Sequence, residues 1–126
     1  MEKMKNSFEV MRGSEELVIS GTRLLKYRGS AARVEVPEGI TEIRPGACAG
    51  LDTVTEVVLP STLTKICSGA FSECISLRVL DIPANVTELE EDAFEDCTAL
   101  RMVAIPSHLE KQARACFPEA DLAILD

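Results

Sequence analysis

Four prolines, Pro37, Pro60, Pro83 and Pro106, stand 23 residues apart, and the residues around them keep the same period. A unit of 23 residues is too small to bury an apolar face alone, so such units become stable only by stacking. We therefore predict a solenoid with repeats at 34–56, 57–79, 80–102 and 103–126. Eight apolar columns run in register through these units, and the two that flank the prolines most closely on the N-terminal side are Val36, Leu59, Ile82 and Ile105, and Val34, Val57, Leu80 and Val103.

Within a unit the pattern changes twice. Apolar and polar residues alternate before each proline, which predicts a half-buried strand that the proline ends. A short extended piece follows, such as residues 40–43, and then a helical turn such as residues 68–74. Ser68 and Asp92 are candidate N-caps of these turns. The expected fold class is an α/β repeat solenoid, with parallel strands on one face and short helical turns on the other.

These units resemble the BspA-type (Treponema-type) leucine-rich repeats. The second unit matches from Leu59-Pro60 through Ala70-Phe71 to Cys74, and the third matches from Ile82-Pro83 to Cys97. The resemblance covers about residues 34–117. It implies a right-handed leucine-rich-repeat solenoid that recognises other proteins, often as part of a bacterial surface adhesin, with no catalytic residues or cofactor to carry over. The first and last units depart from the pattern at Cys48, Leu51, Gln112, Cys116 and Ala120.

Both ends of a solenoid need covering, because an open end exposes apolar ladders and unpaired strand edges. Residues 1–33 are expected to form a hairpin-like N-terminal cap, with short strands at 8–10, 17–19 and 24–27. The last unit is more polar, as a cap should be, and residues 122–125 are expected to form a final strand. That strand is either an exposed edge that serves as a dimer contact or a frayed terminus.

The outward residues of the strands give the candidate partner-binding face. If the residues one and three before each proline point inward, those two and four before point outward. They combine apolar side chains with a carboxylate rim, a composition typical of protein-binding surfaces. The alternative is that β-branched residues are there for strand propensity. The candidate residues are Glu35, Glu56, Val58, Val79, Asp81, Met102 and Ala104.

A second candidate is an acidic patch in the third repeat. Carboxylates are favourable at a helix N-terminus, and that explanation suffices without any partner. The sharper hypothesis is a docking site for a basic protein, whereas calcium binding is disfavoured because the EF-hand glycine and spacing are missing. The patch comprises Glu88, Glu90, Glu91, Asp92, Glu95 and Asp96.

Charge narrows the choice of partner. The net charge of −8 disfavours direct nucleic-acid binding and docking on anionic membranes. It leaves three hypotheses open: a protein-interaction module, an acidic inhibitor or mimic acting on a basic or nucleic-acid-handling protein, and a fragment of a secreted bacterial adhesin. The chain has no signal-peptide-like or membrane-spanning stretch, which places it in the cytoplasm as written and outside the cell if it is such a fragment.

Catalytic and metal-binding motifs are missing. The five cysteines contain no CxxC pair, so we expect buried free thiols and no metal site. His108 shares no column with a cysteine, and no phosphate loop, HExxH or GxSxG motif is present. We therefore predict a non-enzymatic binding module without a cofactor.

Overall fold

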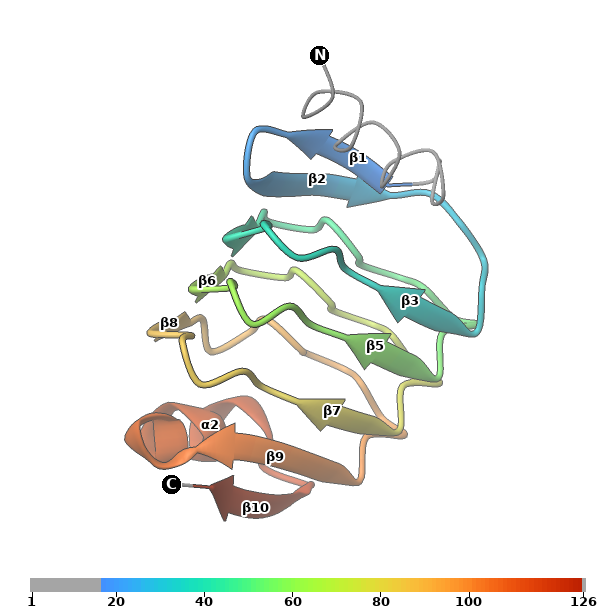
Figure 1. Ribbon diagram of the computed structural model, residues 1–126. Helices are drawn as coiled ribbons and strands as arrows, with labels where there is room; N and C mark the ends of the chain where they lie inside the picture. The colour runs from blue at the N-terminus through green and yellow to red at the C-terminus, as the bar shows by residue number, and fades with distance from the viewer. Residues whose placement is uncertain (1–16, 126) are drawn as a thin grey trace.

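The computed structural model describes residues 17–125, and these form the predicted solenoid of stacked coils (Figure 1). The four strands before the prolines, together with the C-terminal strand, build one parallel sheet, which we call sheet B. Its members, in spatial order, are β10 (Asp121–Leu125), β9 (Met102–Pro106), β7 (Val79–Asp81), β5 (Glu56–Val58) and β3 (Arg33–Glu35). The register repeats every 23 residues from β3 to β9, as Val34 opposite Val57 and Leu80 opposite Val103 illustrate.

The short extended pieces after the prolines form a second sheet, sheet A. Three two-residue strands pair in parallel, and an antiparallel hairpin precedes them. The second strand of the hairpin pairs in parallel with the first of the three, as the strand of a preceding coil would. This hairpin is the expected N-terminal cap, while the expected strand at 8–10 lies outside the described residues. The members are β1 (Leu17–Ser20), β2 (Arg23–Tyr27), β4 (Glu42–Ile43), β6 (Lys65–Ile66) and β8 (Glu88–Leu89).

The third leg of each of the first three coils turns without forming a regular helix, so the proposed N-caps Ser68 and Asp92 have no helix to cap. Left-handed backbone at Gly69 (φ 65°), Glu73 (φ 60°) and Asp96 (φ 64°) limits these segments to turns. The Ser68 hydroxyl instead donates to Asp92 Oδ2 of the next coil at 2.8 Å.

The fourth coil replaces this turn by a regular helix. A 3-10 turn, η1 (Ser107–Leu109), leads into α2 (Glu110–Cys116), whose sequence consists mostly of strong helix formers. The Arg114 guanidinium pairs with Glu110 one turn earlier at 2.6 Å. Strand β10 then follows as the edge of sheet B, close to where residues 122–125 were predicted to form a strand.

The core lies between the two sheets and the turns, and it consists of the predicted ladders. Ile43, Ile66 and Leu89 stack under sheet A, and all three are buried. On the turn side, the rings of Phe71 and Phe94 stack in parallel with centroids 5.0 Å apart. No charged or polar side chain is buried among residues 17–125.

The cysteines are free thiols that serve the core. Four are buried and Cys97 is partly buried, and the Cys74 thiol donates to the Cys48 carbonyl of the preceding coil at 3.0 Å. Burial raises the pKa of Cys48 to about 12. Since the thiolate is the nucleophilic form, Cys48 is chemically inert at neutral pH.

Candidate functional site

The outward face of sheet B is arranged as the alternation predicted. In the third coil's strand β7, Leu80 is buried, whereas Val79 and Asp81 on either side of it are exposed. Val79 is 49% exposed and Met102 is 48% exposed, although both are apolar. Register places Val79 directly beside Met102, so these two side chains form the centre of a continuous apolar strip.

This strip lies in a shallow groove of about 660 Å³. The structure brings six of the seven predicted residues together in its lining and leaves out Glu35 at the edge of the sheet. The groove extends past the strands to residues that the sequence analysis missed, because only strand alternation was used to find outward positions. These additional lining residues are Glu38, Leu59, Ser61, Pro83 and Ala84. The inward-pointing strand residues Val57 and Leu80 also border the groove.

Charges in and beside the groove are mostly acidic. Arg33 is bound to Glu35 at 3.5 Å and to Glu56 at 3.4 Å, so its charge is already matched. Glu38 accepts hydrogen bonds from the Ser61 backbone N–H at 3.0 Å and the Ser61 hydroxyl at 2.8 Å. Both hydrogen bonds lower the pKa of Glu38 below its usual value, and the bond from the Ser61 backbone N–H has the larger effect. The groove therefore presents apolar side chains beside acidic ones, and Glu38 among these stays ionised at neutral pH.

The acidic patch occupies a different place from the one expected. It does not precede a helix, and five of its six residues line a groove between the third coil and the C-terminal segment. The sixth, Glu88, lies outside the groove and pairs with Lys65 at 3.3 Å. The helix-dipole explanation for these acids is therefore wrong.

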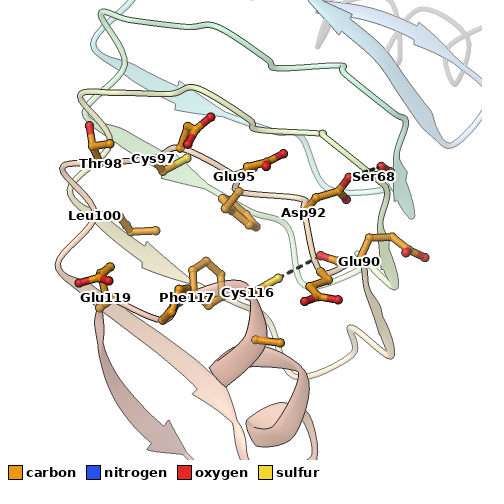
Figure 2. A pocket seen from close by; sticks show the side chains of 16 residues that line it. Ser68, Glu90, Asp92, Glu95, Cys97, Thr98, Leu100, Cys116, Phe117 and Glu119 are labelled. Atoms are coloured by element: carbon orange, nitrogen blue, oxygen red, sulfur yellow. Dashed lines mark hydrogen bonds between the residues drawn. The ribbon is translucent and has the colours of Figure 1, made fainter.

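This acidic groove encloses about 860 Å³, and Figure 2 shows carboxylates around apolar and sulfur-containing side chains. Its apolar part comes from Phe94, Leu100 and Phe117, and Glu119 adds a carboxylate that the sequence analysis missed. The Cys116 thiol donates to the Glu90 carbonyl at 2.9 Å, and burial raises its pKa to about 12. It is thus a protonated structural group.

Residues 17–125 contain no group of three or more His, Cys, Asp or Glu side chains placed to hold a metal ion. The Nε2 atom of His108 lies 2.8 Å from the Val86 carbonyl of the preceding coil, so this ring bridges two coils. None of the helices described in residues 17–125 is long and apolar enough to cross a membrane.

This chain is similar to solved leucine-rich-repeat structures. A leucine rich cell surface protein from Faecalibacterium prausnitzii A2-165 superposes with a TM-score of 0.63 at 22% sequence identity. The match covers 82% of this chain and 35% of that protein, so the chain spans about a third of its length. The T. pallidum leucine rich repeat protein gives a TM-score of 0.44 at 17% identity, over 87% of this chain and 80% of that one. None of the curated proteins matches.

The family comparison agrees with the architecture. The family described as "BspA type Leucine rich repeat region (6 copies)" matches residues 21–125, which include the second strand of the hairpin and all four coils. The matched residues contain the columns of apolar residues and the 23-residue coils, with the alanine–phenylalanine pairs Ala70-Phe71 and Ala93-Phe94 in the second and third turns. This chain belongs to the BspA-type leucine-rich-repeat family.

Proposed function

We propose that this chain is a non-catalytic protein-interaction module whose docking surface is the outward face of sheet B. Leucine-rich-repeat proteins are generally non-enzymatic binding modules, and the family points to a protein-interaction or surface-adhesin role. The observation that carries the proposal is the exposure of Val79 and Met102 at the centre of a groove. Apolar side chains of this size, left half exposed in a concave surface, are typical of sites that another protein covers.

The chemistry of the groove defines the kind of partner. The lining combines the apolar side chains of Val58, Val79, Met102 and Ala104 with two carboxylates. Glu56 lies beside Val79 in the register, and Asp81 lies beside Ala104. A partner that fits this surface brings apolar side chains for the strip and basic ones for its rim. Burying the strip supplies the affinity, since the free energy gained is roughly 25 cal/mol per Å² of apolar area, and the carboxylates supply orientation and specificity.

The same surface suits a segment of a bacterial surface adhesin. The structurally similar protein from F. prausnitzii is described as a cell surface protein, and this chain spans about a third of it. In this setting the partner is a protein outside the cell. The competing hypothesis of an acidic inhibitor or mimic relies on charge alone and does not use the apolar strip.

The test is a double variant, Val79→Glu with Met102→Glu, and a matched control, Ile75→Glu. Ile75 is 50% exposed but lies on a turn outside the sheet B groove. Intact protein carrying a photo-crosslinker at position 58, at the groove wall, is incubated with cell lysate and with host-cell surface extract, at low and high salt. We expect one crosslinked partner that survives high salt, disappears with the double variant and persists with Ile75→Glu. Equal crosslinking by the double variant would remove sheet B as the docking surface.

A further inference from the structure

The turn side of the solenoid is held together by a ladder of backbone hydrogen bonds. The first and second coils each donate two N–H groups, from residues two apart, to carbonyl oxygens of the next coil. The first coil donates from Cys48 to Ala70 at 2.7 Å and from Gly50 to Ser72 at 2.8 Å. The second coil repeats this at the equivalent positions, from Phe71 to Ala93 and from Glu73 to Glu95, both at 2.7 Å.

This ladder stops at the third coil. The equivalent donors are the N–H groups of Phe94 and Asp96, and neither has an acceptor among residues 17–125. The carbonyls that would accept them belong to Cys116 and Pro118, at the end of α2. There the chain follows a helical path, with the Phe117 N–H bonded to the Ala113 carbonyl at 2.8 Å. The loss of register is also visible in the rings, since Phe94 and Phe117 are tilted by 46°.

The acidic groove opens where the ladder stops. Both residues with unpaired N–H groups, Phe94 and Asp96, are among its lining residues. Six carboxylates surround the groove, no lysine, arginine or histidine lines it, and none of these carboxylates takes part in an ion pair within residues 17–125. They are Glu90, Glu91, Asp92, Glu95, Asp96 and Glu119.

We propose that this groove binds an extended, basic segment of a partner protein as one more rung of the ladder. Two carbonyl oxygens of the segment accept hydrogen bonds from the N–H groups of Phe94 and Asp96. Alternate residues of an extended chain are about 6.8 Å apart and present their carbonyls on the same side, which suits donors two residues apart in the coil. Unpaired backbone edges are templates for an added strand, and here the template is a turn ladder.

The charges select the side chains of that segment. Six carboxylates in one concavity focus a negative potential that attracts lysine and arginine and repels acidic segments. A second copy of this chain is a poor occupant, because each copy has a net charge of −8. The apolar lining from Leu100 and Phe117 contacts the aliphatic stems of long basic side chains, which pack on apolar surfaces while their charges face water. This site is separate from sheet B and does not depend on the function proposed for it.

The experiment uses the intact chain and a capped hexapeptide of alternating arginine and valine as the probe. Binding is measured by fluorescence anisotropy, and the backbone amides are followed by NMR with hydrogen exchange. We expect slower exchange of the Phe94 and Asp96 amide protons when the peptide is bound. The variant Glu91→Gln/Glu95→Gln/Glu119→Gln should weaken binding by about tenfold, while Glu73→Gln leaves it unchanged. Glu73 is the matched control because it occupies the position of Asp96 one coil earlier, outside the groove.

Three results would overturn the proposal. One is a peptide of alternating glutamate and valine binding as tightly as the basic probe. Another is a triple variant that keeps full affinity. The third is binding that leaves the exchange of the Phe94 and Asp96 amides unchanged, or that perturbs only sheet B. Because all variants exchange exposed carboxylates for amides of the same size, a loss of affinity with unchanged circular dichroism reports on the groove and not on folding.

Discussion

The outward faces of the two sheets begin alike and then diverge. On sheet A, Arg23, Glu42, Lys65 and Glu88 lie side by side in register, so the charges alternate from strand to strand. Ion pairs join Arg23 to Glu42 at 3.5 Å and Lys65 to Glu88 at 3.3 Å. Arg44 adds a 2.7 Å contact to Glu42. This face satisfies its own charges and offers little to a partner.

The corresponding column of sheet B starts in the same way. Arg33 lies opposite Glu56 and is bound to it. The next two positions are Val79 and Met102, so the alternation of charges is broken by two exposed apolar residues. Both sheets are built from strands paired in parallel over one core, and sheet A forms with alternating charges throughout. The exposed apolar residues of sheet B are therefore not needed for the strands to pair. This break in the alternation is the feature on which the proposed docking surface rests.

The largest expected effect tests what the two sheets share. Ile66 under sheet A and Leu80 under sheet B are both buried. Truncating each to alanine should lower the free energy of unfolding by about 2–5 kcal/mol, measured by urea denaturation. If Leu80→Ala cost far less than Ile66→Ala, the two sheets would not share one core, and the comparison of their outer faces would lose its basis.

A smaller effect is expected from making sheet B resemble sheet A. Val79→Lys places a cation opposite Glu56 and continues the alternation that starts at Arg33. The free energy of unfolding should change by no more than about 0.5 kcal/mol, because exposed ion pairs contribute little. Partner capture should fall by about tenfold, since the apolar centre is lost.

The matched control for Val79→Lys is Ile75→Lys, at an equally exposed apolar residue outside the groove. Capture is quantified by titrating the crosslinking yield against protein concentration. Undiminished capture by Val79→Lys would mean that the break in alternation has no role in binding.

The smallest effect concerns the ion pairs of sheet A. The hydrogen bond from Arg44 is the main reason why the pKa of Glu42 lies below its usual 4.5. A carboxyl with a lowered pKa in the folded state stabilises the fold above its unfolded pKa, and this contribution is lost as the pH falls through the lowered value. Glu42→Gln should therefore be slightly less stable than the parent protein at pH 7, and the difference should vanish in acid.

Urea denaturation between pH 2 and pH 8, on the order of one point per pH unit, measures this convergence. Added salt should also shrink the difference at neutral pH, because salt screens exposed charges. A difference that persisted unchanged into acid would show that Glu42 acts through packing and not through its charge.

Most of the fold could be predicted from the 23-residue period, whereas less could be predicted of the sheet B groove and the acidic groove. Alternation before Pro60 and Pro83 correctly oriented Val57 and Leu80 inward. It also found six lining residues of the sheet B groove. Alternation did not identify Glu38, because this residue follows Pro37, outside the strand, and its direction depends on how the chain turns after the proline. The acidic residues were correctly grouped as one patch, but they were predicted to lie at a helix N-terminus. The left-handed backbone at Asp96 makes this segment a turn instead.

The coil, its repeat length and the inward or outward direction of the strand residues can be predicted from the 23-residue apolar period, because such a period can be buried only by stacking units in register. The place where that stacking fails depends on how the folded segments pack. The helical path of α2 follows from the good helix formers at 110–116. Once α2 packs beneath the third coil, the N–H groups of Phe94 and Asp96 have no acceptor in the ladder, and an acidic groove opens there. Whether a hydrogen bond between coils forms depends on the relative position of two segments more than twenty residues apart, and no local pattern encodes that distance.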